Sequence, residues 1–375
     1  MSTAKGACER CLRRGWLVAR LSGHIETATA REPGSRAREL LALSDTELVE
    51  ALAPNRTGQI LTELAEFDPG PMRERLRRTE CWSLCRHLEA YPRALRGDRQ
   101  APPALFGRGE TELLERLNGE VAVTVVGSRR PSAYGRELAT ALGRELASAG
   151  LVVVSGMALG IDSCAHRGAL EAGCLTAAVL GNGPDLPYPA RMRRLYGEIV
   201  GRGLVLGELP PGTEPRRWTF PARNRIMAAL GAITVVVEAR DRSGSLITAE
   251  MASDLGRDVG AVPGRVGHSP AAGTNSLLRD GAALIRDAQD VLDTLVGAGV
   301  AVRVRTPAES RRELDPALKP VVEAVEGGAE TLDAISRQSG LAPGPAAAAA
   351  ARLELLGVLS CDSAGRYRRA ATQGP

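Results

Sequence analysis

Several apolar runs in this sequence end in short loops rich in glycine, serine and arginine, a composition suited to anion binding. Gly127-Ser128-Arg129, Ser155-Gly156 and Ser243-Gly244-Ser245 each lie between an apolar run and a helical pattern. The first N–H groups of a helix have no intrahelical partner and the helix dipole makes that end positive, so such loops present donors to phosphate oxygens. Hydroxyl and guanidinium groups add further donors. The spacing therefore predicts a phosphate-binding site built from several loops.

Basic charge is concentrated in residues 187–226. This segment has eight arginines and three glutamates, whereas the whole 375-residue chain has a formal net charge of +4. It also contains Trp218 and Phe220, so positive charge and stacking surface occur together here. A solvated charged surface is the alternative, but prolines frame the segment and it leads directly into a helix, which favours ligand binding. The polar side chains that flank the two aromatic residues include Arg217, Arg223, Asn224 and Arg225.

Composition limits the class of protein and the kind of partner. With 44% hydrophobic and 25% charged residues, the chain can bury a core, so general disorder is excluded. Only Lys5 and Lys319 of its 48 basic residues are lysines, a bias that we attribute to a GC-rich genome. Three tryptophans, five tyrosines and three phenylalanines are too few for a broad stacking platform. Nucleic-acid binding would therefore rest on placed arginines and backbone amides.

Neither a membrane span nor a signal peptide is evident in the sequence. No apolar run approaches the roughly 18–20 residues that a transmembrane helix needs, and the first residues lack an apolar core with a small-residue cleavage site. The seven cysteines are sparse compared with a secreted disulfide scaffold. We therefore expect a cytoplasmic protein without a membrane partner.

The central part of the chain has the pattern of an α/β domain. From about residue 121 to 295, short apolar runs alternate with helical patterns, which is typical of βαβ units in a parallel sheet. We expect a doubly wound, mostly parallel, Rossmann-like sheet. The expected strands are 121–127, 151–155, 175–181, 204–208, 232–239, 258–263 and 283–286, and the expected helices include 134–149, 192–202, 223–230 and 246–255.

The regions on either side of this domain are predicted to be helical. Residues 1–84 form an expected N-terminal helical domain, the Rossmann-like domain spans 85–296, and a polar linker covers 297–316. The last region, 317–375, has three helical patterns, a turn at Ser339-Gly340 and an apolar Gly357-Val358-Leu359 that could form a wing strand, which together predict a winged-helix-like domain. The helices expected in the N-terminal domain are 8–21, 37–43, 45–52 and 58–67.

Cofactor and enzyme motifs are not evident in the glycine-rich loops. The loop at Gly127 lacks the second glycine that lets a pyrophosphate approach, so NAD and FAD are disfavoured and we expect no organic cofactor. Asp162 is expected to cap the helix after the second strand. His166 is expected to pack within that helix, because no nucleophile or metal-ligand set lies beside it in the sequence.

Seven motifs, in order along the chain, resemble those of the DNA-processing protein A (DprA/Smf) family. The match covers about residues 85–296, and the ordered set makes it specific. The C-terminal region resembles the winged-helix domain that many members carry, and the N-terminal helices occupy the place of the family's SAM-like domain. The matching motifs are Gly127-Ser128-Arg129, 155–162, Tyr188-Pro189, 208–212, 220–225, 243–249 and Pro263-Gly264.

This resemblance implies a non-enzymatic protein of natural transformation. It implies that the protein binds incoming single-stranded DNA, forms a homodimer and loads the RecA recombinase. Phe220 is then the expected base-stacking residue. The rest of the expected DNA- and phosphate-binding set is Gly127, Ser128, Arg129, Ser155, Gly156, Arg217, Arg223, Asn224, Arg225, Ser243, Gly244 and Ser245.

Cysteines outside the family motifs indicate a separate metal site. Cys8 and Cys11 form a C-x2-C pair, and Cys81 and Cys85 precede His87 where the helical domain joins the sheet. Thiolate and imidazole ligands could hold a structural Zn²⁺ that ties the N-terminus to the central domain, and the four cysteines are the expected ligands. A reduced cysteine cluster without metal is the alternative.

Two other functions compete with DNA binding by the central domain. A nucleotide-processing enzyme of the phosphoribohydrolase type would carry a Pro-Gly-Gly-x-Gly-Thr-x-x-Glu loop. The corresponding residues 243–250 lack the double glycine, so we expect Glu250 on a helix surface or in a polar network. A duplex-DNA regulator would read bases through the C-terminal helix 345–356, but that helix is rich in alanine, with Arg352 and Glu354 as its charged residues. Packing or partner contact is the expected role of this helix.

Overall fold

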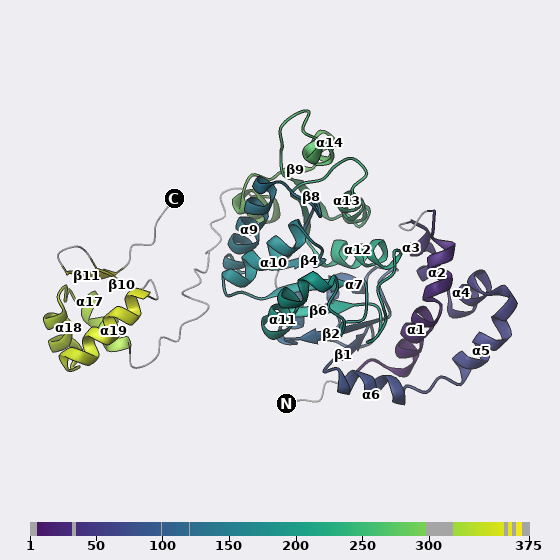
Figure 1. The fold of residues 1–375 in the computed structure, drawn as a ribbon, viewed down its shortest axis with the longest axis horizontal. Helices are drawn as coiled ribbons and strands as arrows, with labels where there is room; N and C mark the ends of the chain where they lie inside the picture. The colour runs from purple at the N-terminus through teal and green to yellow at the C-terminus, as the bar shows by residue number, and fades with distance from the viewer. Residues whose placement is uncertain are drawn as a thin grey trace. The chain divides into compact units, whose positions relative to one another are not determined.

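The computed structural model of this chain divides into two units. It describes residues 6–31, 35–98, 100–119, 121–297, 318–355, 359–361 and 365–369. One unit lies within residues 1–304 and the other within residues 305–375. In Figure 1 the first unit is coloured from purple to green and the second from light green to yellow.

The first unit is built on a nine-stranded sheet with the order β1-β2-β6-β5-β4-β3-β7-β8-β9. The strands from β6 to β9 in this order pair in parallel, as predicted for the seven apolar runs, and these seven strands are confirmed. The strands are β1 (Trp82–Cys85), β2 (Ala104–Gly109), β3 (Ala122–Val126), β4 (Val152–Ser155), β5 (Thr176–Leu180), β6 (Leu204–Gly207), β7 (Ile233–Val236), β8 (Asp258–Ala261) and β9 (Ala283–Leu284).

The antiparallel strands β1 and β2, which extend one side of the sheet, were not predicted from the sequence. β1 pairs with β2, and β2 pairs with β6, both antiparallel. β1 has only four residues and is flanked by charged ones, so its apolar pattern is too short to distinguish it from a loop in the sequence. The sheet therefore begins at Trp82, before the boundary expected at residue 85.

The strand order reverses between β3 and β7. In chain order, β4, β5 and β6 are added on one side of β3, and β7, β8 and β9 on the other. At such a point, the loops that leave two neighbouring carboxyl ends turn to opposite faces of the sheet, which opens a crevice. Gly127 follows β3 and Ser243 follows β7, so two of the predicted anion-binding loops flank this crevice.

Helices cover both faces of the sheet, because residues on both sides of each parallel strand are apolar. Val123 and Val125 of β3 pack against α9, α10 and α15, whereas Ala122 and Val126 share a core with α7, α8, α12 and α13. Among the described residues, no helix is both long and apolar enough to cross a membrane. These helices are α7 (Arg93–Arg96), α8 (Glu112–Gly119), α9 (Ala133–Ser148), α10 (Ile161–Glu171), α11 (Arg193–Arg202), α12 (Thr219–Leu230), α13 (Gly244–Asp254), α14 (Ala272–Arg279) and α15 (Ala288–Val296).

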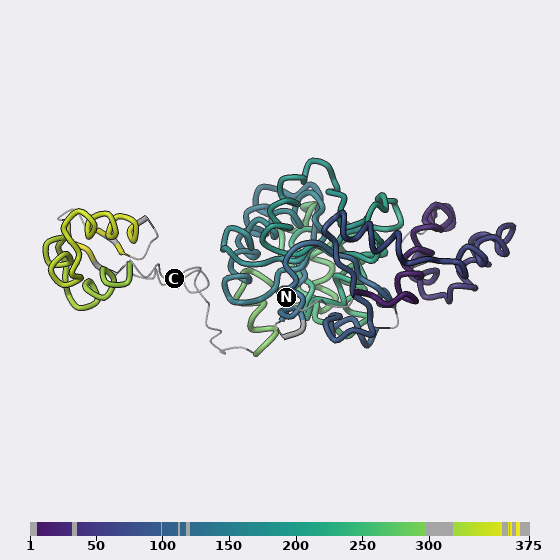
Figure 2. Tube along the Cα trace, turned by 90° about the horizontal axis from the view of Figure 1, so that it is seen from below, coloured from purple at the N-terminus to yellow at the C-terminus, as the bar shows by residue number. Residues whose placement is uncertain are grey.

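The N-terminal helices form a layer with a core of its own. The four predicted helices are present, and the structure adds α2 and α6. Figures 1 and 2 show these purple to blue helices gathered at one end of the first unit. Their bounds are α1 (Glu9–Arg20), α2 (Ser22–Ala28), α3 (Ser35–Ala42), α4 (Asp45–Leu52), α5 (Thr57–Ala65) and α6 (Gly70–Arg78).

Trp218 anchors this layer to the central sheet and does not face a ligand. The side chain is 1% exposed and packs with Leu21 and Ile25 in the core of the N-terminal helices. Its indole N–H donates to the carbonyl of Ser22 at 3.1 Å, and its backbone N–H donates to the Glu26 carboxylate at 3.3 Å. The prediction that Trp218 offers stacking surface to a ligand is therefore wrong. The helices that cover it are distant in the sequence, so the local pattern could not indicate its burial.

The described part of the second unit, residues 318–355, 359–361 and 365–369, contains three helices and a two-stranded antiparallel sheet. The helices share a core that includes Val321, Ile335 and Leu353. Thr331 caps α18 by accepting a hydrogen bond from the Ala334 N–H, and Gly340 ends that helix at a φ of 72°. The predicted linker 297–316, apart from Gly297, lies outside the described residues. The elements are α17 (Lys319–Glu326), α18 (Leu332–Ser339), α19 (Pro343–Leu355), β10 (Leu359–Cys361) and β11 (Tyr367–Arg369).

His166 lies in the core between α10 and β5, so the predicted packing role is confirmed. The ring is 0% exposed, and its Nδ1 lies 2.8 Å from the Thr176 hydroxyl. That hydroxyl donates to the carbonyl of Val153, so Nδ1–H is the donor to it and the ring is neutral. Burial, together with the nearby Arg223 charge, lowers the pKa of His166 from 6.5 to about 3.

We predict that His166 makes the protein less stable in acid. The unfolded chain takes up a proton near pH 6.5, whereas the folded chain resists protonation down to about pH 3, so the free energy of unfolding falls as pH falls between these values. Replacing His166 with leucine should lower stability at neutral pH but flatten this dependence. Denaturant unfolding at several pH values measures both effects, and an unchanged slope in the variant contradicts the assignment.

We also predict that Trp218→Ala loosens the N-terminal helices. Removing a fully buried indole should cost about 3–5 kcal/mol, whereas Tyr134→Ala, at a side chain that is 57% exposed, should stay within about 0.5 kcal/mol. Denaturant unfolding followed by circular dichroism compares the two variants. Equal midpoints would show that Trp218 does not hold the layer.

Candidate functional site

A cleft of about 780 Å³ opens at the reversal of strand order. Four segments distant in sequence line it: the loop after β3, the segment after β4 with Ala158 and Asp162, the start of α12 and the loop after β7. Tyr188, from the loop between β5 and α11, joins them. Ten of the thirteen predicted binding residues line this cleft, namely Gly127, Ser128, Arg129, Arg217, Phe220, Arg223, Asn224, Ser243, Gly244 and Ser245.

The loop after β3 is held in place by its own backbone and by its neighbours. The Ser128 N–H donates to the carbonyl of Glu238 at 2.7 Å, and the Ile161 N–H donates to the carbonyl of Ser128 at 3.1 Å. The Ser128 hydroxyl accepts from the Arg130 N–H at 3.1 Å. Gly160 has a φ of 86°, and a Cβ there would collide with the Ser128 carbonyl, so only glycine lets the second loop approach the first. The position of Arg129 is therefore set by contacts of its neighbour Ser128 with the segments that follow β4 and β7.

The N-terminus of α13 forms the opposite wall. Ser243 caps this helix, because its hydroxyl accepts from the Ser245 N–H at 3.4 Å. The two serine hydroxyls lie 2.8 Å apart, and a Cβ at Gly244 would meet no atom within 4 Å, so the backbone is open there. The helix dipole adds a positive potential at the same place. This wall therefore has the hydroxyl and N–H donors expected of a phosphate site.

A pair of aromatic rings forms the floor between these walls. The Phe220 and Tyr188 centroids are 5.5 Å apart at an interplanar angle of 30°. The Arg129 guanidinium carbon lies 5.7 Å from the Phe220 centroid, within the range of a cation–π contact. Tyr188 is 42% exposed and Phe220 is half-buried. The sequence singled out Tyr188 only as part of a family motif, because its approach to Phe220 depends on the packing of two loops.

Exposed guanidinium groups surround the aromatic pair. Residues lining the cleft include five exposed arginines and, among exposed acidic residues, Asp241. Arg240 and Arg242 were absent from the predicted set, although their position directly after an apolar strand was a usable signal. The five arginines are Arg129, Arg130, Arg217, Arg240 and Arg242.

Arg223 is buried beneath the cleft, where hydrogen bonds to the protein occupy much of its guanidinium group. It therefore does not offer its whole guanidinium to a ligand. It is 7% exposed, and its Nη1 donates to the carbonyls of Gly156, at 2.7 Å, and of Val179. Its Nε donates to Asn224 Oδ1 at 3.0 Å, and the Asn224 amide donates to the Gly244 carbonyl at 3.4 Å. Burial lowers the pKa of Arg223 to about 10, which Asp162 opposes. Arg223 therefore ties the ends of β4 and β5 to the start of α13.

Asp162 binds the backbone of the loop after β4 and does not cap α10. Its Oδ2 accepts from the N–H groups of Gly156 and Ala158, at 3.2 and 3.3 Å. α10 begins after Gly160 and has no side-chain cap, which corrects the expectation of a helix cap. Burial raises the pKa of the Asp162 carboxyl, and Arg223 opposes that shift. The carboxylate is engaged with backbone donors and lies at the base of the cleft.

Three predicted residues do not line the main cleft. Ser155 is 0% exposed, and its hydroxyl donates to the Val125 carbonyl at 2.6 Å. Gly156 lines a small adjoining hollow, and a Cβ there would collide with the Arg223 guanidinium. Arg225 does not line the cleft, and its Nη2 donates to both carboxylate oxygens of Glu208, at 2.7 Å each. Both arginines of α12 are thus structural, whereas the exposed arginines of the cleft lie outside this helix.

Glu250 does not contribute to the cleft. It is exposed on α13, as expected for a helix-surface residue, and it is not among the residues that line the cleft. The comparable loop of a phosphoribohydrolase-type enzyme would need this acid at the ligand. The geometry therefore favours binding over the hydrolytic alternative.

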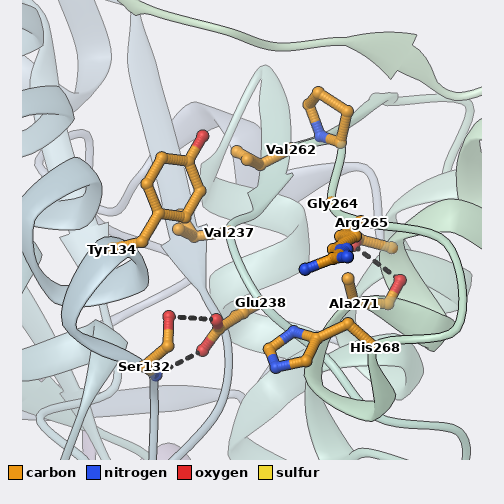
Figure 3. Close-up of a pocket in the computed structure, with 11 residues that line it drawn as sticks. Ser132, Tyr134, Val237, Glu238, Val262, Gly264, Arg265, His268 and Ala271 are labelled. Atoms are coloured by element: carbon orange, nitrogen blue, oxygen red, sulfur yellow. Dashed lines mark hydrogen bonds between the residues drawn. The ribbon is translucent and has the colours of Figure 1, made fainter.

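A second hollow of about 530 Å³ lies beside the first, between the start of α9 and the loop after β8. Figure 3 shows the Glu238 carboxylate turned toward Ser132, whose N–H and hydroxyl donate to it at 2.9 and 2.6 Å. Arg265 and His268 lie on the other side of this hollow. Glu238 is thus occupied in holding the N-terminus of α9, which sets the angle at which the loop after β3 leaves the sheet.

The cysteine cluster differs in one member from the predicted zinc ligands. Cys8, Cys11, Cys85 and His87 have ligand atoms within 4.8 Å of one another. Cys81 is not part of this group, and its thiol donates to the Thr79 carbonyl at 3.4 Å. The imidazole takes the place expected for Cys81, because Cys81 precedes β1 whereas Cys85 and His87 follow one another at its end.

Comparison with known sequences matches this chain to proteins of DNA processing. The family model described as DNA recombination-mediator protein A matches residues 82–296. A putative DNA processing protein DprA of Mycobacterium tuberculosis is 43% identical over 249 residues, which cover 66% of this chain and 64% of the relative, so the chain spans slightly less than two thirds of that protein. Protein Smf of Synechocystis is 34% identical over 310 residues, covering 74% of this chain and 78% of Smf.

Solved structures agree with the sequence matches. DprA of Streptococcus pneumoniae superposes with a TM-score of 0.61 at 32% identity, covering 76% of this chain and 96% of that one. DprA of Helicobacter pylori, whose structure concerns its single-stranded DNA binding mode, has a TM-score of 0.51 at 34% identity and covers 56% and 94%. The mixed α/β fold with a mostly parallel sheet is thus shared with these proteins.

We predict that a buried arginine and an exposed arginine of the cleft contribute differently to the free energy of unfolding. Arg225→Ala leaves the buried Glu208 carboxylate without its partner and should cost about 3–5 kcal/mol of unfolding free energy. Arg130→Ala removes an exposed side chain of the cleft and should change it by no more than about 0.5 kcal/mol. Chemical denaturation of both variants tests this, and similar losses in both would contradict the division.

Proposed function

This chain belongs to the DNA recombination-mediator protein A family, and we propose on that premise that it binds single-stranded DNA in the cleft between β3 and β7. The observation that carries the proposal is the Phe220–Tyr188 pair surrounded by exposed arginines. Bases have an aromatic face and phosphates have a negative charge, and the cleft offers one surface for each. The structural relative from Helicobacter pylori, described by its single-stranded DNA binding mode, supports the same assignment.

Phosphates bind at the two walls in this proposal. Arg129 and Arg217 supply guanidinium groups, and the capped start of α13 supplies N–H and hydroxyl donors. Such contacts recognise the backbone irrespective of base identity, so binding is independent of sequence. Each neutralised phosphate releases condensed counterions, so affinity decreases strongly with salt.

The position of the aromatic pair favours single strands over duplex. Phe220 is half-buried between the walls, so only an unpaired base can present its face to the ring. In a duplex, each base is stacked and paired, and exposing it costs unstacking energy. Stacking on an aromatic side chain contributes about 1–3 kcal/mol per base, which a duplex cannot gain here without opening.

We extend the proposal to a role in DNA uptake and recombination. The family resemblance implies a homodimer that acts in the cytoplasm during natural transformation and loads the RecA recombinase on the bound strand. It also implies a SAM-like fold for the N-terminal helices and a winged-helix fold for the C-terminal unit. Three helices followed by an antiparallel strand pair support the latter. Light scattering of purified protein tests the dimer, and RecA filament assembly on protein-coated DNA tests the loading.

Binding without catalysis is the activity that we propose. The alternative, hydrolysis of nucleoside monophosphates, needs an acid in the cleft. Two acids line the cleft: Asp162 accepts from two backbone N–H groups, and Asp241 is exposed after β7. Glu250, which corresponds to the acid of the enzyme motif, lies outside. Release of free base from nucleoside monophosphates by the purified chain would favour the enzyme.

We predict that Arg129→Ala and Phe220→Ala each weaken binding to a short oligo(dT). Loss of a charged donor or of a stacking ring should lower affinity about 10-fold or more, and Arg129→Ala should also reduce the salt dependence by about 0.7 per lost phosphate contact. Fluorescence anisotropy at two salt concentrations, with single-stranded and duplex probes, measures both quantities.

Arg194→Ala is the matched control for Arg129→Ala. The Arg194 side chain is 93% exposed on α11 and does not line the cleft, so its loss changes the net charge equally but should leave affinity within about twofold. Equal losses in both variants would show that general charge, and not the cleft, binds DNA. Equal affinity for duplex and single strands would rule out the proposal itself.

A further inference from the structure

Four potential metal ligands meet where the N-terminal helices join the edge of the sheet. Cys8 precedes α1 and Cys11 lies in its first turn, whereas Cys85 ends β1 and His87 follows in the next turn. Their ligand atoms all lie within 4.8 Å of one another, although the two pairs are more than seventy residues apart in sequence. Neither pair lies in the DNA cleft, so a role for this cluster does not depend on the proposed function.

The nitrogen–sulfur distances within this cluster match those of a tetrahedral zinc site. With Zn–S near 2.3 Å and Zn–N near 2.0–2.1 Å, a sulfur and a nitrogen ligand of one tetrahedron are about 3.6 Å apart. The His87 Nδ1 lies 3.4 Å from Cys8 Sγ, 3.6 Å from Cys11 Sγ and 3.7 Å from Cys85 Sγ. One nitrogen is thus nearly equidistant from three sulfurs, an arrangement that hydrogen bonding alone does not require because a neutral imidazole nitrogen has a single donor or acceptor site.

The backbone around the cluster is fixed on both sides. The Cys8 carbonyl accepts from the N–H groups of Cys11 and Leu12, both at 3.0 Å, which forms the first turn of α1. The Ala7 N–H donates to the Ser83 carbonyl at 3.2 Å and lies 3.1 Å from the Ser83 hydroxyl, so the start of α1 is bound to β1. The ligands are therefore preorganised, and a metal would order little further chain on binding.

The burial pattern gives the cluster a closed side and an open side. Cys11 and Cys85 are buried beside Leu12 and Phe106, whereas Cys8 is half-buried and His87 is exposed. An ion can enter past the imidazole while the apolar side excludes water. This is the environment of a structural site with four protein ligands and no position left for a substrate.

We propose that Cys8, Cys11, Cys85 and His87 bind one structural Zn²⁺ ion, which fastens the first turn of α1 to the end of β1. Three thiolates and one imidazole match the Cys₃His ligand set of structural zinc sites, whereas the common iron–sulfur clusters use four cysteines. A disulfide between Cys8 and Cys11 would use two sulfurs and leave the other two groups without a role. The zinc would hold the helical layer at one end, and Trp218 holds it at another.

Metal content of the untagged protein tests this proposal. Mass spectrometry of the metal should find about one zinc per chain in the wild type, and less than about a tenth of that in Cys11→Ser. Cys81→Ser is the matched control, because it removes a neighbouring thiol outside the cluster and should keep the full zinc content. A wild-type protein without zinc that also fails to take up added Zn²⁺ under reducing conditions overturns the proposal.

Two measurements on the unchanged chain keep the test valid if the variants do not fold. Replacement of the metal by Co²⁺ should give the visible absorption of a tetrahedral site together with thiolate charge-transfer bands. Removal of the metal by a chelator should lower the melting temperature, and added Zn²⁺ should restore it. Octahedral cobalt spectra, or a Cys8–Cys11 disulfide found by peptide mass mapping in reductant-free protein that does not bind zinc after reduction, would refute the site.

Discussion

The parallel pairing of β3 with β7 is the constraint on which the rest of this structure depends. Val125 lies opposite Val235 in that pair, and every later strand of the parallel sheet is added outward from one of these two. Because the crossovers diverge here, the loops after the two strands separate and leave a cleft at their carboxyl ends. α12 then crosses one face and brings Phe220 between the loops. The register of β3 with β7 therefore brings together the aromatic pair, the arginines and the start of α13.

The arginines of residues 187–226 divide into two groups with different roles. Arg223 and Arg225 are buried; Arg223 donates to carbonyl oxygens and Arg225 donates through Nη2 to Glu208, and these contacts hold loops and helices in position. Arg217 is exposed at the cleft, where Arg129 from another loop joins it. A buried guanidinium must be paired because desolvation of an unpaired charge is costly. The same residue type therefore stabilises the scaffold within α12 and faces the cleft in the loops around it.

The N-terminal helices and the sheet are parts of one compact unit. Trp218 and Glu26 join them near the cleft, and the cysteine–histidine cluster joins them at β1. The segment that begins α12 is thus held by Ser22 and Glu26 of α2, two residues before Phe220. A layer expected from the sequence as a separate domain contributes in this way to the geometry of the binding surface.

Much of the fold and of the candidate site could be predicted from the sequence, because both depend on local residue patterns. Apolar runs of strand length predicted the seven parallel strands, and the Gly-Ser-Arg and Ser-Gly-Ser loops predicted six residues of the cleft, since the ends of parallel strands must share one edge. The basic segment and the family resemblance gave four more, Arg217, Phe220, Arg223 and Asn224. The sequence could not assign Trp218 to the core, Arg225 to an ion pair, or His87 in place of Cys81. Those outcomes depend on which elements distant in the chain pack together. Residue type and spacing determined what each loop can bind, and tertiary packing decided which side chains remain exposed to bind it, because burial commits a polar group to an internal partner.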